Sequence, residues 1–227
     1  MWEDRGKVGV TNMIFLDIET APAGECPPAP EEHLARVGNA TKPETVERKR
    51  AENLASWPET WAKQASLDWR LGRIVCLGMA QDDGPVTVTR GNERDILIDL
   101  WGVFVGFAYI QVVGFGLKSF DWPWILGRSA VVGVKPTRIL NTGRYNTSDL
   151  VDWQDILCGY GGLSMTGWSL ESYAELFQTN FRPWGRGSDI AGWVASGDTD
   201  SIRRHCESDI HTTRDLDRIC RPVWLGK

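Results

Sequence analysis

Two acidic residues stand at the end of an apolar segment near the beginning of the chain. Asp17 and Glu19 follow Ile14-Phe15-Leu16 and are separated by one residue. Because side chains alternate across a β-strand, both carboxylates would project from the same face. Two neighbouring carboxylates repel each other and lose hydration, so we expect a cation beside them, and Mg²⁺ or Mn²⁺ suits oxygen ligands best. The alternative is a strand that ends in solvent, with two hydrated acids at its tip.

A third acid, Asp121, stands where a helix is predicted to begin. The apolar segment Ile110 to Phe115 leads through a short loop to Asp121, and Pro123 follows in the expected first turn. Asp is a favoured N-cap and Pro is tolerated early in a helix, so capping alone explains Asp121. A helix that begins beside the end of a strand also lies close to Asp17 and Glu19, so capping and metal binding can coexist.

A fourth acid and a histidine belong to the last predicted helix. One face of this helix follows a 4-3-4-3-4 spacing and comprises Ile202, Cys206, Asp209, Thr213, Leu216 and Cys220. Asp209 therefore lies on the inward face, and His205, one turn earlier, reaches the same pocket. The alternative is a slightly rotated face, with Asp209 on its polar side and His205 as a structural histidine.

The elements that must position these residues alternate between strands and helices. Strands are predicted at Val8 to Ile18, Arg73 to Gln81, Pro85 to Arg90, Ile110 to Phe115 and Asp149 to Val151. Asp82-Asp83-Gly84 joins the second and third as a hairpin. Helices are predicted at Glu93 to Phe107, Asp121 to Val131, Leu170 to Phe177 and Ser201 to about Cys220, with another directly after the strand Asp149 to Val151. This order predicts an α/β fold with a mixed sheet covered by helices.

The length of 227 residues suits a single domain, with a core at about residues 8–222. A polar, helix-favouring segment at about residues 25–70 interrupts it and predicts a surface insertion with one or two helices.

Composition narrows the classes of function. The acidic first residues do not predict a secretory leader, and the apolar segments are too short to predict a membrane span. The five scattered cysteines suit reduced thiols, so we expect a cytoplasmic protein. A net charge of −5 excludes a broad basic clamp for nucleic acid. It does not exclude a small cleft in which cations reverse the local field.

Aromatic and basic residues near the acids are candidates for substrate contacts. Trp122 and Trp124 adjoin Asp121 and would stack on terminal bases, with core packing as the alternative. The loop from Phe181 to Gly187 combines cations, aromatics and glycines and is a reasonable place to bind phosphates. A solvated loop without a role explains it equally well.

Three segments together resemble the exonuclease motifs of the DnaQ-like, or DEDD, superfamily. They are Asp17-Ile18-Glu19-Thr20, Ser119-Phe120-Asp121-Trp122-Pro123-Trp124 and His205-Cys206-Glu207-Ser208-Asp209. The most similar subgroup is the predicted 3′–5′ exonucleases related to the proofreading domain of family-B DNA polymerases, and the resemblance runs from about Val8 to Leu216. It implies an RNase H-like fold, with a five-stranded mixed sheet of three antiparallel strands plus parallel strands and a helical insertion after the first strand.

The resemblance also implies a chemistry and its residues. Stepwise release of nucleoside monophosphates from the 3′ end of single-stranded DNA is expected, with RNA as the other candidate substrate. Two divalent cations, Mg²⁺ or Mn²⁺, are implied, and no organic cofactor. The expected metal ligands are Asp17, Glu19, Asp121 and Asp209, with His205 as a further catalytic residue. The expected substrate-binding residues are Thr20, Phe120, Trp122 and Trp124.

Two departures from the family pattern leave an alternative open. The subgroup with this spacing has Tyr where this chain has His205, and the branch that uses His places it one residue earlier, at the position of Arg204. The family commonly has Asn at the position of Gly116. The alternative function is therefore a catalytically degenerate exonuclease-fold module that binds nucleic acid or protein.

Overall fold

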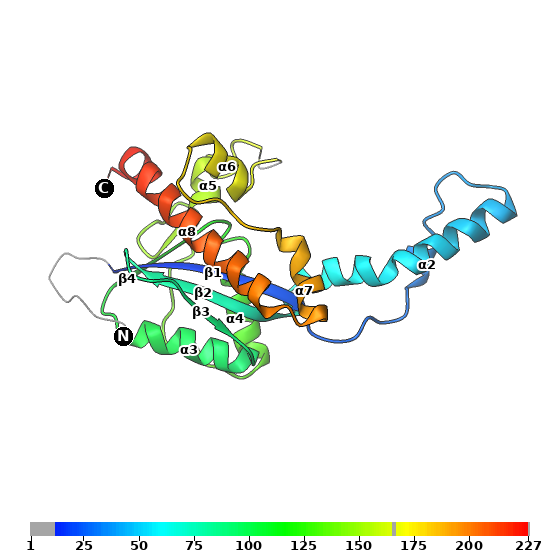
Figure 1. Ribbon diagram of the computed structural model, residues 1–227, viewed down its shortest axis with the longest axis horizontal. Coiled ribbons are helices and arrows are strands. Elements are labelled where there is room, and N and C mark those ends of the chain that lie inside the picture. Colours follow the sequence, from blue (N-terminus) through cyan, green and yellow to red (C-terminus); the bar gives the residue numbers. More distant parts are fainter. Residues whose placement is uncertain (1–11, 165–166, 227) are drawn as a thin grey trace.

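A mixed sheet of five strands forms the centre of the computed structural model, which describes residues 12–164 and 167–226 (Figure 1). The strand order is β3-β2-β1-β4-β5. The strands are β1 (Asn12–Pro22), β2 (Gly72–Gln81), β3 (Thr87–Arg90), β4 (Ile110–Gly114) and β5 (Leu150–Asp152). Strands β3, β2 and β1 are antiparallel, and β4 and β5 continue the sheet in parallel with β1. The predicted five-stranded mixed sheet is confirmed.

Strand β1 differs from its prediction at both ends. Val8 to Thr11 lie outside the described residues. At the other end the strand does not stop at Ile18, because pairing with β2 resumes after a bulge between Glu19 and Thr20 and continues to Pro22. A bulge re-aims side chains locally, so the irregularity falls directly beside the predicted carboxylate pair.

The alternation of β1 assigns its side chains to two different cores. Ile14, Leu16 and Ile18 pack against α3 (Glu93–Val105) and α4 (Asp121–Val131) on one face. Phe15 packs on the other face, with apolar residues of α5 (Trp153–Leu157), α6 (Leu170–Leu176) and α8 (Thr199–Trp224). Figure 1 shows α3 and α8 on opposite sides of the sheet. Asp17 and Glu19 have the same parity as Phe15, so the alternation directs their side chains to the face of α8.

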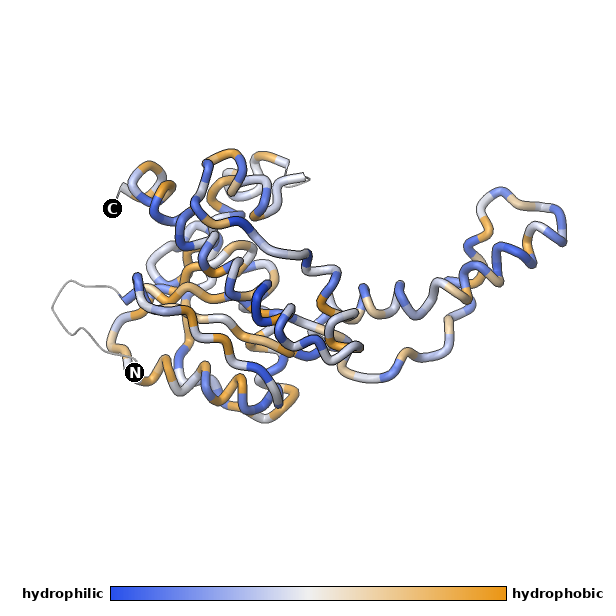
Figure 2. The backbone as a smooth tube through the Cα atoms, viewed as in Figure 1, coloured by the Kyte–Doolittle hydropathy of each residue, from blue (hydrophilic) through white to orange (hydrophobic). Residues whose placement is uncertain are grey.

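The predicted helical insertion is present and extends away from the sheet (Figure 1). It contains α1 (Glu31–Leu34) and α2 (Pro43–Ser66). The rings of His33 and Trp57 pack 4.9 Å apart and join these two helices. Figure 2 shows that this arm is mostly hydrophilic along its length, whereas the strands are hydrophobic. Among the described residues, no helix combines the length and apolar character that a membrane span requires.

The last third of the chain contains one helix that the sequence pattern did not predict. Helix α7 (Ile190–Ser196) follows a short 3₁₀ helix at Gly187–Asp189 and ends at Gly197, which has a φ of 73°. Helix α8 is longer than the predicted Ser201 to Cys220. It begins after Asp198, whose side chain accepts a hydrogen bond from the Ser201 amide at 3.0 Å, and it continues through Pro222.

Candidate metal centre

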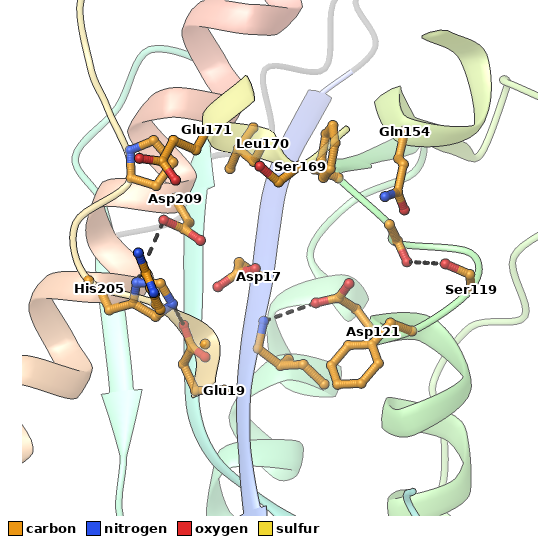
Figure 3. Close-up of a pocket in the computed structure, with 18 residues that line it drawn as sticks. Asp17, Glu19, Ser119, Asp121, Gln154, Ser169, Leu170, Glu171, His205 and Asp209 are labelled. Carbon is orange, nitrogen blue, oxygen red and sulfur yellow. Dashed lines mark hydrogen bonds and ion pairs between the residues drawn. The ribbon is translucent and has the colours of Figure 1, made fainter. Parts of the chain in front are cut away.

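The predicted acids and the histidine converge on one open cavity of about 460 Å³. Asp17 and Glu19 come from β1, Asp121 from the beginning of α4, and His205 and Asp209 from α8, and all five line the cavity. Figure 3 shows their side chains directed toward a common space. The volume falls within the range of small-ligand sites, roughly 300–1,000 Å³. Residues almost 200 positions apart in the chain are thus brought together.

Asp121 is tied to β1 and does not act as a helix cap. It is the first residue of α4, and Phe120 occupies the N-cap position without a side-chain hydrogen bond. The Asp121 carboxylate instead accepts a hydrogen bond from the Ile18 amide at 3.0 Å (Figure 3). The capping explanation for Asp121 is therefore wrong, and the interaction holds this carboxylate beside Asp17 and Glu19 of β1.

His205 is held in one orientation by the loop that precedes α7. Its ring is buried, with 5% of the residue exposed, and Nδ1 lies 2.6 Å from the Trp184 carbonyl oxygen. A carbonyl oxygen only accepts, so Nδ1 carries the proton and donates. Nε2 then lies 3.5 Å from Glu19 Oε1. The structural-histidine and catalytic explanations are thus compatible, because a backbone bond at one nitrogen directs the other into the cavity.

Burial and mutual repulsion raise the pKa values of the acids. Burial raises the pKa of Asp17 well above its ordinary value, and the charges of Asp121 and Asp209 raise it further. Burial, and then the charge of Asp17, raises the pKa of Glu19 in the same way. Burial raises the pKa of Asp121 to about 7, against the opposing effect of the Ile18 hydrogen bond. Burial also raises the pKa of Asp209 to about 6, while His205 opposes the shift.

The donor set fits hard divalent cations. Within the described residues, Asp17 Oδ2 is buried and has no hydrogen-bond partner. Ligand atoms of Asp17, Glu19 and Cys206 all lie within 4.8 Å of one another. The Cys206 thiol donates to the Asp17 carbonyl oxygen at 3.8 Å and does not line the cavity, so carboxylate oxygens dominate the accessible donors. Four oxygen-bearing side chains with an unpaired, buried oxygen among them suit Mg²⁺ or Mn²⁺.

Two of the expected substrate-binding residues are core residues instead. Trp122 and Trp124 are each 2% exposed, and the Trp122 ring packs edge-on against Trp101 at 5.7 Å. Neither ring has a free face for a base, so the stacking prediction for both is wrong. The alternative, core packing, holds.

Phe120 and Thr20 differ in their access to the cavity. Phe120 is half-buried and lines the cavity. The Thr20 hydroxyl donates to the Ser66 carbonyl oxygen at 2.6 Å, where it ties β1 to the end of the insertion helix α2, and Thr20 does not line the cavity. The side chain of Thr20 is therefore committed to the fold.

Several lining residues were not among the expected site residues. Gln154, Ser169, Leu170 and Glu171 line the cavity together with the predicted residues, as do Ser119 of the second motif and Arg186 of the loop from Phe181 to Gly187. Gly116 also lines it, with a φ of 76°, a left-handed conformation that Gly adopts freely and Asn tolerates. A Cβ atom at Gly116 would lie 3.2 Å from Gln154 Oε1, so Gln154 occupies the space beside this glycine. Of these residues, Ser119 and Arg186 carried a sequence signal, through the second motif and through the loop from Phe181 to Gly187.

Asp152 supports the site through hydrogen bonds to the loop that precedes α4. It is buried, and its carboxylate accepts hydrogen bonds from the amides of Gly116 and Lys118 at 2.9 and 2.8 Å. It also caps α5. Asp152 thus fixes the loop between β4 and α4 from which Asp121 enters the cavity.

Comparison with known proteins supports the fold. No family model matches the sequence, and no curated protein matches it. Among solved structures, the chain is similar to the family B DNA polymerase from the hyperthermophilic archaeon Pyrobaculum calidifontis, with a TM-score of 0.62 and 16% sequence identity. The similarity covers 94% of this chain and 25% of the polymerase, so the chain spans about a quarter of that protein's length. This likeness agrees with the five-stranded mixed sheet and with an RNase H-like fold.

Proposed function

We propose that this protein is a metal-dependent 3′–5′ exonuclease that removes nucleoside monophosphates from the 3′ end of single-stranded DNA. One observation carries the proposal: carboxylates from β1, α4 and α8 line one cavity, and buried Asp17 Oδ2 has no partner within the described residues. An uncompensated cluster of this kind is costly unless cations neutralise it. The similarity to a DNA polymerase supports a nucleic-acid substrate.

Asp17, Glu19, Asp121 and Asp209 would hold the two divalent cations. When bound, such a pair supplies an activated water and neutralises charge on the leaving oxygen. The Ile18 amide engages Asp121 Oδ1, which orients this side chain before a cation arrives. The charges of both Asp121 and Asp209 act on Asp17, so a cation held by Asp17 would relieve repulsion from both sides.

His205 would accept the proton of the attacking water at Nε2. With Nδ1 donating to the Trp184 carbonyl oxygen, the neutral ring would present the lone pair of Nε2 to the cavity. The water oxygen forms a bond to the terminal phosphorus, and the bond from phosphorus to the 3′ oxygen of the preceding nucleotide breaks. The 3′ oxygen takes up a proton from solvent, and His205 returns the proton of the attacking water to solvent. The products are a nucleoside 5′-monophosphate and a strand with a new 3′ hydroxyl. A general base of this kind contributes about 10²–10⁴ in rate.

The apolar part of the cavity suits a terminal nucleotide of any sequence. Phe115, Phe120 and Leu170 are half-buried and line it. Base–aromatic stacking tolerates every base because each presents a π-face. The same surface would accept RNA, and discrimination would depend on contacts to the 2′ position.

Incubation with labelled oligomers tests the proposal. Single-stranded DNA and RNA labelled at the 5′ end are incubated with Mn²⁺ or Mg²⁺, and EDTA serves as the control. A ladder that shortens from the 3′ end only with the cation is expected, and the preferred oligomer identifies the sugar. Tight binding without any shortening would overturn the exonuclease proposal and favour a degenerate binding module.

A further inference from the structure

Arg186 stands out among the residues around the cavity because of its charge. Five carboxylates line the cavity: those of Asp17, Glu19, Asp121, Glu171 and Asp209. Among the described lining residues, Arg186 is the one that carries a guanidinium. It is exposed, and within residues 12–164 and 167–226 its guanidinium forms no ion pair with a carboxylate.

Other arginines of the chain have guanidinium groups that are paired within the fold. The guanidinium of Arg128 is buried against Glu93 at 2.7 Å, and that of Arg221 pairs with Asp217 at 2.7 Å. Arg182, in the same loop as Arg186, donates to the Thr179 hydroxyl at 2.7 Å. Arg186 therefore retains its donors for a ligand, and a planar guanidinium fits the oxygens of a phosphate in a bidentate manner.

The loop that carries Arg186 is fixed on one side by aromatic packing. The Trp184 ring stacks on Trp193 with centroids 5.4 Å apart, and the Arg204 guanidinium lies 4.5 Å from the Trp184 ring centroid. The Trp184 amide donates to the Ser208 hydroxyl at 2.8 Å. Gly185 has a φ of 73°, and a Cβ atom there would lie 2.6 Å from the Trp193 ring. These contacts hold in place the backbone of Trp184 and Gly185, the two residues before Arg186.

The same loop also orients His205, through the Trp184 carbonyl. We propose that Arg186 binds a phosphodiester of the substrate strand. One short loop then positions both the strand, through Arg186, and the proposed general base His205, through the Trp184 carbonyl. This inference rests on the proposed function, because it places a nucleic-acid strand in the cavity. Arg186 holds an internal phosphate of the strand rather than the phosphate of a released mononucleotide, because Arg186 is exposed whereas the carboxylates of Glu19 and Asp121 are buried.

The experiment measures binding separately from cleavage. Anisotropy of a 5′-labelled single-stranded DNA oligomer is recorded with Ca²⁺ in place of Mg²⁺, and the labelled strand is checked for shortening. A charge-assisted hydrogen-bonded contact is worth about 1.5–3 kcal/mol, so Arg186→Ala is expected to weaken binding about 10- to 100-fold. It should also reduce the slope of log K against log salt by about 0.7, the value for one phosphate of a single strand.

Matched variants keep the test specific. Arg94→Ala removes one positive charge from an exposed position on α3, on the other face of the sheet, and is expected to bind as the wild type does. Arg186→Lys should recover part of the affinity and the full salt slope, because it keeps the charge and loses the bidentate geometry. Unfolding temperatures confirm that each variant is folded.

The outcomes separate this inference from the proposed function. Wild-type affinity and salt slope in Arg186→Ala would overturn the Arg186 assignment even if the wild-type protein shortens DNA normally. A loss that affects a nucleoside monophosphate but not the oligomer would overturn the assignment to an internal phosphate. Binding that depends on Arg186 in a protein that never shortens DNA would support the inference while the exonuclease proposal fails.

Discussion

The Asp121 carboxylate accepts a hydrogen bond from the backbone amide of Ile18 at 3.0 Å, and Ile18 is the residue between Asp17 and Glu19. The first turn of α4 is thereby attached to β1 at the residue that separates the two acids of the strand. One oxygen of Asp121 serves the fold, and under the proposed function the other would bind a cation. The hydrogen bond of Asp121 and its negative charge can therefore be tested separately by substitution.

Asp121→Asn and Asp121→Ala are expected to differ in stability but not in activity. Asn keeps an acceptor for the Ile18 amide, whereas Ala leaves a buried N–H without a partner, which costs about 1–3 kcal/mol. Both variants lose a carboxylate that the proposed function assigns to cation binding, so both should lose most cleavage. Urea unfolding in EDTA measures the first effect and oligomer shortening the second. Equal unfolding free energies for the two variants would contradict the structural role of this hydrogen bond.

Most of the fold was predictable because its signals are local. Asp82-Asp83-Gly84 fixed the hairpin of β2 and β3, and the boundaries of α4 agree with the prediction because Asp121 and Pro123 mark its beginning. Helix α7 was missed because its seven residues include Gly192 and give too short a pattern to show helical periodicity. The extension of β1 to Pro22 depends on pairing with β2, which local sequence does not encode.

The site was predictable only in part, for a similar reason. The alternation of Asp17 and Glu19 and the helical spacing of His205 and Asp209 placed each pair on one face of its own element. The burial of Trp122 depends on Trp101 and Phe104 of α3, which a pattern within α4 does not reveal. Arg186 required knowledge of which neighbouring arginines are paired, and that information exists only in the folded chain.

Phe120 and Trp122 provide a test of which aromatic contacts the substrate. Phe120→Ala should weaken oligomer binding by about 1–3 kcal/mol, the usual contribution of one stacked base. Trp122→Phe should lower the free energy of unfolding, by less than the ~3–5 kcal/mol of complete truncation, and leave KM unchanged because the ring lies in the core. Steady-state kinetics and urea unfolding of both variants check these effects. An increase in KM for Trp122→Phe without a loss of stability would contradict the core assignment.

The metal-free protein is expected to become less stable as pH rises through the pKa values of its acids. Asp209 and Asp121 have folded-state pKa values of about 6 and about 7, both above the ordinary value of 3.8. A raised pKa means that folding takes up protons, so this contribution to stability is fully present below about pH 4 and is lost as pH rises through about 6 to 7. Urea unfolding in EDTA between pH 4.5 and 8 measures it. Asp209→Asn should make the free energy of unfolding less dependent on pH, and Mn²⁺ should restore stability at pH 8. The same pH dependence in the wild type and in the variant would contradict the assignment of this effect to Asp209.

The ion pair of Glu93 and Arg128 is expected to support the fold without affecting the chemistry. Both side chains are buried, their charged atoms lie 2.7 Å apart, and Glu93 also accepts a hydrogen bond from the Ile74 amide at 2.7 Å. Removing one partner of a buried pair costs about 3–5 kcal/mol because the other charge is left unpaired. Arg128→Met should therefore show that loss in urea unfolding, while kcat at a temperature where the variant is folded stays near that of the wild type. A loss of kcat without a loss of stability would place Arg128 in the site.

Variants of Asp17 and His205 are expected to fail in different ways, because the proposed function has Asp17 hold cations and His205 accept a proton. Asp17→Ala removes the carboxylate on which the charges of Asp121 and Asp209 act, so it should abolish both cleavage and the rise in unfolding temperature with Mn²⁺. His205→Ala leaves the four carboxylates in place, so it should keep the Mn²⁺ effect and retain cleavage at about 10²–10⁴ below the wild-type rate. Thermal unfolding with and without Mn²⁺, together with single-turnover cleavage, distinguishes the two. Complete loss of both properties in His205→Ala would instead make His205 a part of the metal site, and its bond to the Trp184 carbonyl would then orient a ligand rather than a base.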